Sequence, residues 1–233
     1  MKTRLISVAT ATLTLTMLCQ SSATYADSLV LAGGSASPNS VYGYLGALLP
    51  VGTDLGQPGF VARLWASGLR FDYDSASVGE VRGRGPEFEA ALGHLWAFGD
   101  NRLTFYAGVK YRHIHLQPKD PDSDAERRHW GVSTQLDLYQ RFSQSWGLSA
   151  IAGYTALVHD YWIRARPTFN AGPVTWGPEA IFAGGDEYTD NRYGLFVDRI
   201  PLGALQLGIS GGVEREHGRG TDPYGAISLA IVF

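Results

Sequence analysis

The sequence has little cysteine, little charge and no strongly basic balance. Its single cysteine excludes a disulfide framework and a cysteine-rich metal site. Charged residues make up 18% of the 233 residues, which is low against the roughly 25% of soluble domains. The net charge of -3 and the pI of about 6.0 lack the basic footprint of a nucleic-acid-binding protein. We therefore expect no nucleic-acid partner.

Long apolar runs and helical periodicity are also missing. Beyond residue 26, no apolar run approaches the ~20 residues of a membrane-spanning helix. Apolar residues do not recur at the three- and four-residue spacing of an amphipathic helix. The glycine-rich stretches, such as Gly211-Gly212, do not have the spacing of a phosphate-binding loop, and we expect no cofactor.

Glycine and aromatic residues are plentiful instead. The chain holds 29 glycines and is 12% aromatic and 45% hydrophobic, with a mean hydropathy of -0.08. The apolar fraction is ordinary, which argues against disorder. The mixture is poor in helix formers and rich in strand and turn formers, so the composition favours an all-β fold.

The first 26 residues have the layout of a secretory signal peptide. Lys2 and Arg4 form a basic start, the stretch 5–19 is apolar and threonine-rich, and small residues lead to Ala26. The apolar stretch is too short to span a membrane. We expect cleavage after Ala26, with Ala23 as the alternative, and a single domain over residues 27–233.

The dominant pattern after residue 26 has a period of two. In residues 224–233, large apolar residues alternate with mostly small or polar ones, and the stretches 103–112, 130–139 and 205–214 repeat this alternation. These stretches are long, about 10–15 residues against a usual 5–6. Full charges occupy the middle of the polar faces, and aromatics lie at the ends of the apolar faces.

An apolar outer band, aromatic girdles and a polar interior are typical of an outer-membrane barrel. We therefore predict an antiparallel transmembrane β-barrel in the cell outer membrane, in contact with outer-membrane lipid and lipopolysaccharide. Phe233, at the end of an alternating strand, also matches the usual terminal signal of bacterial barrels.

The period and the turn residues predict twelve strands, an even number as bacterial barrels require. Merging the first pair, or the pair that flanks His159-Asp160, gives ten as the alternative. With twelve strands both termini face the periplasm, the periplasmic turns are short, and the extracellular connections 75–85, 117–126 and 216–222 are longer. The predicted strands are 28–36, 40–51, 60–74, 86–98, 102–116, 127–142, 146–157, 160–169, 173–185, 191–200, 205–215 and 223–233.

The predicted interior carries charges of both signs and a few aromatics. A two-residue turn at 99–100 places Lys110 opposite Glu89 and Arg112 opposite Glu87, whereas a turn at 100–101 shifts each partner by two and keeps the face. Either register predicts a ladder of ion pairs. Such charges either fill and solvate the lumen or line a path, and the sequence leaves both open. The lumen-facing candidates are the charged Arg70, Glu87, Glu89, Lys110, Arg112, Asp137, Arg141, Arg164, Arg166 and Glu179, and the aromatic Tyr106, Tyr139, Trp162 and Phe196.

Catalytic and metal-binding sets are not evident. His113 and His115 share one face of a strand, but no third ligand is apparent, so we predict no metal site. His129 and Ser133 share a face but lie about 13 Å apart along a strand, too far for a hydrogen bond. We assign no catalytic residues. A rim enzyme acting on lipid or polysaccharide remains the alternative to a non-enzymatic barrel.

Two stretches resemble a known family. Residues 41–74 begin with an aromatic-Gly-Tyr-x-Gly motif at Tyr42 and re-enter a strand with Arg63 after a glycine-rich turn. Residues 176–197 contain the step Gly177-Pro178-Glu179. Both resemble hairpins of the BcsS family of cellulose biosynthesis proteins. The resemblance implies an outer-membrane barrel accessory to cellulose production or export, with cellulose or the secretion apparatus as partner.

Overall fold

The computed structural model describes residues 28–233 except 124, 127, 157–158, 187 and 217–219. The predicted signal peptide, residues 1–26, lies outside the described residues. In the described part of the chain, no helix is long and apolar enough to cross a membrane. The secondary structure is all β and antiparallel throughout.

The strands agree closely with the predicted ranges. They are β1 (Leu29–Ser37), β2 (Ser40–Val51), β3 (Gly59–Ser75), β4 (Gly79–Phe98), β5 (Asn101–His113), β6 (His115–Gln117), β7 (Arg128–Arg141), β8 (Trp146–Thr155), β9 (Asp160–Ala171), β10 (Val174–Gly184), β11 (Thr189–Leu202), β12 (Leu205–Glu216) and β13 (Gly220–Val232).

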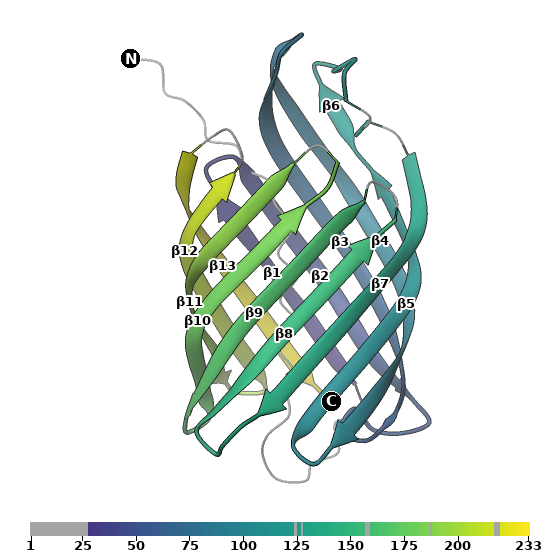
Figure 1. Cartoon of the computed structure of the whole chain (residues 1–233). Coiled ribbons are helices and arrows are strands. Elements are labelled where there is room, and N and C mark those ends of the chain that lie inside the picture. Colours follow the sequence, from purple (N-terminus) through teal and green to yellow (C-terminus); the bar gives the residue numbers. More distant parts are fainter. Residues whose placement is uncertain (1–27, 124, 127, 157–158, 187, 217–219) are drawn as a thin grey trace.

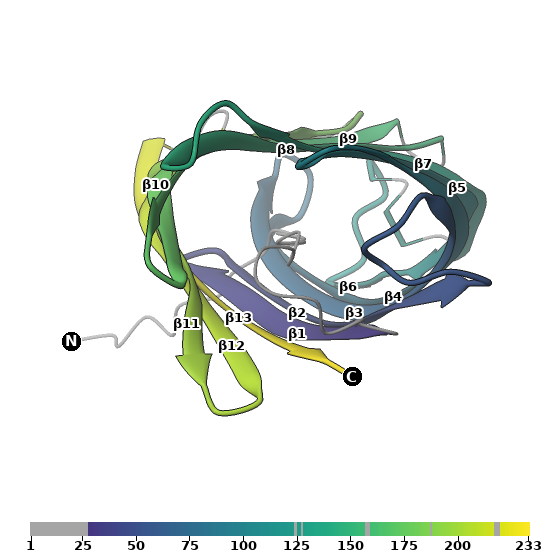
Figure 2. The same cartoon turned by 90° about the horizontal axis from the view of Figure 1, so that it is seen from below.

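The sheet closes into a barrel of twelve strands, which confirms the predicted number. Neighbours in sequence are neighbours in the wall, and β1 pairs with β13 to close the ring (Figure 2). This β1–β13 seam is lined on its inner face by small or aliphatic side chains, with Leu31 opposite Ala230 and Gly33 opposite Ser228.

The described part of the chain has thirteen strands, and the one that is not counted in the barrel is the short β6, which continues β5. Both pair with β4 in one uninterrupted register, so they form one long strand broken only at Ile114. At the break the β5 backbone comes so close to β4 that a Cβ on Gly85 would lie 1.8 Å from the carbonyl oxygen of His113. Glycine at residue 85 therefore permits the bend that carries β6 beyond the barrel.

Alternation separates the two faces of the wall. Outward side chains form an apolar band that includes Leu45, Leu92, Val132, Leu195 and Ile227, all at least half exposed. Outward aromatics flank this band at both ends. The lower girdle includes Phe60, Trp96, Phe98, Phe142, Trp146, Phe169 and Trp176, and the upper girdle includes Phe88, Trp130, Tyr154, Tyr161 and Tyr193. Such girdles mark the two membrane interfaces.

The lower end of the barrel in Figure 1 carries the described ends of the chain and short turns, such as 99–100, 172–173 and 203–204. The expected long loops at the upper end are mostly wrong. The stretch 75–85 is chiefly strand, because β3 runs to Ser75 and β4 starts at Gly79. In the stretch 216–222, residue 216 belongs to β12 and residues 220–222 belong to β13. The charged residues and glycines in these stretches show that the chain has left the membrane. The strands nevertheless continue to pair there, because pairing still gives each backbone amide and carbonyl a hydrogen-bond partner.

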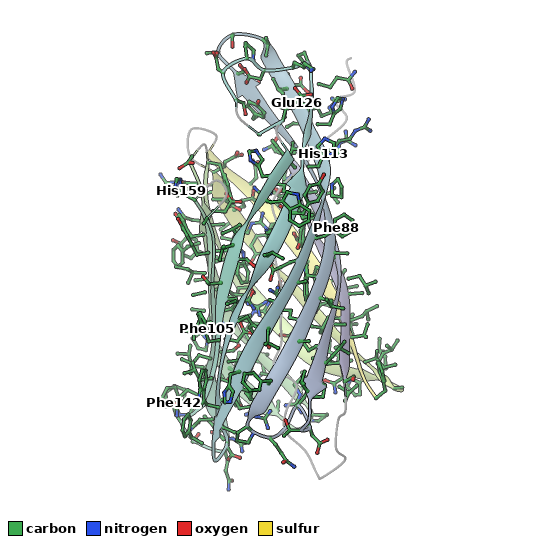
Figure 3. All side chains as sticks on the ribbon, turned by 90° about the vertical axis from the view of Figure 1, so that its right-hand side faces the viewer. Phe88, Phe105, His113, Glu126, Phe142 and His159 are labelled. Atoms are coloured by element: carbon green, nitrogen blue, oxygen red, sulfur yellow. The ribbon has the colours of Figure 1, made fainter. Side chains whose placement is uncertain are left out.

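The extended β3 and β4 and the short β6 form a sheet that projects above the barrel (Figures 1 and 3). Val81, Ile114 and Leu116 make a small buried core there. Asp120, from the connection after β6, accepts a hydrogen bond from Tyr73 of 2.9 Å. Desolvation opposes ionisation of Asp120, but hydrogen bonds from the Asp122 amide and Tyr73 outweigh it and lower the pKa of this carboxyl.

The outward band predicts how the barrel responds to a misplaced charge. Leu92 lies on β4 midway between the two girdles and is 54% exposed to the surroundings of the barrel. We expect Leu92→Arg to destabilise the barrel by about 2–4 kcal/mol, because the guanidinium must enter hydrocarbon. Urea titration of barrels refolded into lipid vesicles, followed by tryptophan fluorescence, measures the change.

The matched control is Val78→Arg. Val78 lies at the β3–β4 turn of the projecting sheet, outside the apolar band, and should accept arginine with little change in the midpoint. Equal losses at residues 78 and 92 would contradict the assignment of the outward band to lipid.

Candidate functional site

The candidate site is the lumen, and alternation directs the side chains that fill it. All the predicted lumen residues except Arg70 lie on the inward face of their strands. Arg164, Arg166, Asp137, Glu179 and Glu87 are each at most 3% exposed. Arg141 lies at the lower rim, where its guanidinium contacts Asp100 at 2.9 Å.

The placement of Arg70 in the lumen is wrong. On β3 the inward residues are Val61, Arg63, Trp65 and Ser67, so Arg70 has the opposite parity and is exposed on the outer face. It lies on the part of β3 that leaves the membrane band. Beyond the membrane band an outward charged side chain does not have to enter lipid. The charge of a residue therefore does not predict there whether its side chain points inward or outward.

One charge cluster centres on Glu87. The β4–β5 hairpin has the predicted register, with Glu87 opposite Arg112 and Glu89 opposite Lys110. Arg112 bonds to Glu87 and also lies 2.5 Å from Asp160 of β9. Lys110 reaches diagonally to Glu87, with 3.4 Å between Nζ and Oε2.

Glu89 has a different partner from the one predicted. It pairs with Arg63, which enters from β3 and is only 1% exposed. The ladder therefore includes a third strand, and its cations and carboxylates alternate across the lumen wall. This arrangement offsets the cost of removing each charge from water.

A second cluster lies across the lumen on β9 to β13. Arg166 binds Glu179 and lies 2.6 Å from Asp198. The hydroxyl of Tyr224 donates to Glu179 at 3.0 Å, and the Arg166 guanidinium lies 4.4 Å from the ring centre of Phe196. These contacts join four strands of the wall, β9, β10, β11 and β13.

Arg192 of β11 links β12 to this second cluster. Its guanidinium lies 3.0 Å from Asp190 and 3.1 Å from Glu214 of β12. It also lies 5.4 Å from the ring centre of Tyr224. Every strand from β9 to β13 therefore takes part in the second cluster.

Sequence reasoning missed an aromatic cluster on β2 and β3. Tyr44 stacks on Trp65 with ring centroids 4.8 Å apart, and the Trp65 indole donates to the Tyr42 hydroxyl at 3.3 Å. Gly46 makes room, since a Cβ there would lie 2.1 Å from the indole. The alternation of Tyr42, Tyr44 and Gly46 was visible in the sequence, and applying parity to this strand would have found the cluster.

Inward side chains from all parts of the wall are packed inside the barrel. Each of the twelve barrel strands contributes at least one inward side chain that is at most 5% exposed. Every strand of the barrel therefore has at least one position where its inward side chain is packed against its neighbours. In strand order the twelve are Leu31, Tyr42, Arg63, Leu95, Tyr106, Asp137, Ile151, Arg164, Ile181, Arg192, Glu214 and Tyr224.

Among the described residues, no three His, Cys, Asp or Glu side chains are grouped so that they could hold a metal ion. Within that part of the chain, the buried hydroxyl of Ser133 has no hydrogen-bond partner. His129 and Ser133 both lie on the inward face of β7, and the structure does not bring them into hydrogen-bond contact.

Comparison with known families gives one match over nearly the whole described chain. Residues 29–233 match the sequence model described as "Cellulose biosynthesis protein BcsS". A sequence search of curated proteins finds no match.

Solved structures with a similar fold are outer-membrane barrels of low sequence identity. An outer membrane channel from Pseudomonas putida F1 has a TM-score of 0.62 at 11% identity, covering 91% of this chain and 97% of that one. KdgM porin in complex with disordered oligogalacturonate has a TM-score of 0.52 at 9% identity, covering 88% and 99%. The β domain of the Bordetella autotransporter BrkA has a TM-score of 0.51 at 12% identity, covering 88% and 98%. This likeness and the lipid-facing band place the protein in the outer membrane.

The second cluster predicts a large cost for removing one buried carboxylate. Glu179→Gln keeps the size of the side chain but leaves Arg166 with Asp198 as its remaining ion-pair partner. We expect a loss of about 3 kcal/mol in the free energy of unfolding, because a buried cation loses a compensating charge. Urea titration in vesicles measures this loss.

Glu80→Gln is the control for that substitution. The Glu80 side chain is 68% exposed and its contact to Arg82 is 3.4 Å long, so its removal should cost about 0–1 kcal/mol. A Glu179→Gln barrel as stable as the Glu80→Gln barrel would show that the second cluster does not stabilise the wall.

Proposed function

The chain belongs to the BcsS family of cellulose biosynthesis proteins, and on that premise we propose that it is a non-enzymatic accessory of cellulose production. In this proposal the barrel assists export or organises the secretion apparatus, and its lumen does not conduct the glucan. The observation that carries the proposal is the packing inside the barrel, where each of the twelve strands contributes a nearly buried side chain.

The chemistry of the lumen supports this role. A glucan path needs aromatic faces arranged along its length, because sugar rings stack on them. Here Tyr42, Tyr44 and Trp65 are packed on one another, and the Arg63 guanidinium lies 4.8 Å from the Trp65 ring. Their faces are therefore occupied by protein.

The charges of the lumen argue in the same direction. One barrel of similar fold was solved in complex with oligogalacturonate, which is an acidic saccharide. Cellulose is neutral and gains nothing from buried ion pairs. In this chain the cations Arg63, Arg166 and Arg192 already contact carboxylates of the wall.

A deletion strain tests the accessory role. Without the gene, we expect secreted cellulose to fall several-fold while synthase activity in isolated inner membranes is unchanged, and the wild-type gene should restore secretion. Unchanged cellulose secretion would refute the role. Altered lipid A or altered cellulose acylation in the deletion strain, with secretion intact, would favour a rim enzyme instead.

Planar bilayers test the closed lumen directly. Purified wild-type barrel should give no large, steady conductance. A variant that carries Arg63→Ala, Trp65→Ala and Arg164→Ala removes buried bulk from β3 and β9 and should open measurable channels. A wild-type conductance as large as that of the triple variant would contradict the filled lumen, and heat-modifiable mobility in gels shows whether both proteins are folded.

A further inference from the structure

The lower end of the β11–β12 hairpin, residues 200–207, departs from the barrel wall. We call these residues the β11–β12 tip. Figure 2, which views the barrel from below, shows this tip outside the ring that the other strands form. The departure begins at a β-bulge, where the β11–β12 register shifts between Val197 and Ile200. Within the bulge, Arg199 has a φ of 62°, a left-handed conformation that residues other than glycine rarely adopt. Because a bulge bends the strand that carries it, this bulge accounts for the change in direction.

The β11–β12 tip is attached to the wall through one neighbour. The pairing of β10 with β11 extends only as far as Thr175 opposite Asp198. On the other side, β12 pairs with β13 down to Leu205 opposite Ile231. Within the described sheet, residues 200–202 of β11 therefore pair with β12 alone. An outward turn of the tip breaks no pairing with β10.

The β11–β12 tip is apolar and exposed. Residues 200–207 read Ile-Pro-Leu-Gly-Ala-Leu-Gln-Leu, with no charged side chain and a single amide. Leu202 is 50% exposed and Leu205 is 38% exposed. Other turns at the lower end are polar, since the β4–β5 turn contains Asp100 and the β7–β8 turn contains the serines and glutamine of 143–145. The tip therefore has a different environment to satisfy from these turns.

The outer face of the β11–β12 tip continues the lipid-facing band. Residues opposite one another share a face of the sheet, so the register gives the outward rows. One such row crosses β11, β12, β13 and β1 with apolar side chains throughout: Leu202, Leu205, Ile231 and Val30. The row above it is apolar as well: Ile200, Leu207, Leu229 and Ala32. Lipid that covers the β12–β13–β1 face therefore meets the tip with no change in polarity.

The height of the β11–β12 tip matches the interface of the periplasmic leaflet. Trp176 of the lower girdle is opposite Val197. Leu202 follows Val197 by five residues, one of which the bulge absorbs. Four paired residues span about 13 Å along a strand, or about 10 Å across the membrane at a tilt of about 40°. The outward bend shortens this drop, and the short turns place the lower end of the barrel on the periplasmic side.

We propose that the β11–β12 tip inserts into the phospholipid of the periplasmic leaflet and anchors one side of the barrel there. Leu202 and Leu205 contact acyl chains, and the turn between them lies at the level of the headgroups. This surface is on the outside of the barrel and does not depend on the proposed function of the lumen.

Nitroxide labels on single cysteines test this placement. Cys19 is the one cysteine of the chain, so Cys19→Ser gives a background for Leu202→Cys in barrels reconstituted into phospholipid vesicles. Collisions with oxygen report lipid, and collisions with a water-soluble nickel chelate report water. We expect the label at residue 202 to favour oxygen several-fold, as a label in Leu195→Cys should, because Leu195 is 66% exposed in the lipid-facing band. Asp100→Cys, in a polar turn, should favour the nickel chelate.

Two results at residue 202 would overturn the assignment to phospholipid. A label that behaves as the one at residue 100 would place the β11–β12 tip in periplasmic water. A label shielded from both oxygen and the nickel chelate would place the tip against protein, either a second copy of this chain or a periplasmic partner.

A second set of variants tests whether the leucines hold the tip in lipid. With the label in Ala204→Cys, the double change Leu202→Ser and Leu205→Ser should raise collisions with the nickel chelate several-fold, because the tip loses most of its apolar area. Leu64→Ser with Leu92→Ser replaces outward leucines of similar exposure on β3 and β4, and this matched control should leave the label unchanged. An unchanged label in the tip variant, or an equal rise in the control, would contradict the proposal. Heat-modifiable mobility shows that each variant is folded.

Discussion

The structure depends on the pairing of backbone amides and carbonyls within a layer that holds no water. Each unpaired group costs several kcal/mol in hydrocarbon, so a sheet in the membrane must close on itself. All twelve strands meet this requirement, and β1 meets β13 at the seam. Closure forces alternate residues inward and outward, and the outer band, the girdles and the charged lumen all follow from that alternation.

The inward side chains show how the barrel can bury charge inside its wall. Arg63, Arg166 and Arg192 are nearly fully buried, yet each meets carboxylates from neighbouring strands. Rings lie against their guanidinium planes, and these contacts add to the ion pairs. These pairs come from several strands, so the buried charges also link parts of the wall that are distant in sequence.

Local patterns in the sequence were enough for the strands, because a period of two shows where they run. The short turn limited the β4–β5 hairpin to two registers, and the structure has the one with the turn at 99–100. The partner of Lys110 could not be predicted in this way. It bonds to Glu87 and leaves Glu89 to Arg63, and Arg63 arrives from a strand whose register depends on the whole wall. The outward position of Arg70 was missed for a related reason. Charge predicts an inward side chain only within the membrane band, and β3 extends beyond it.

The seam between β1 and β13 differs from the β9–β11 part of the wall in its inward contacts. The inner face offers pairs such as Gly33 with Ser228 and Leu31 with Ala230, and the outer pairs include Val30 with Ile231. Backbone hydrogen bonds and small or aliphatic contacts hold the seam, whereas buried ion pairs fasten β9 to β11. Its two strands are also the most distant in sequence, so joining them carries the largest loop-closure entropy. Of all the pairings in the wall, the seam is therefore the one whose formation costs the chain the most conformational entropy.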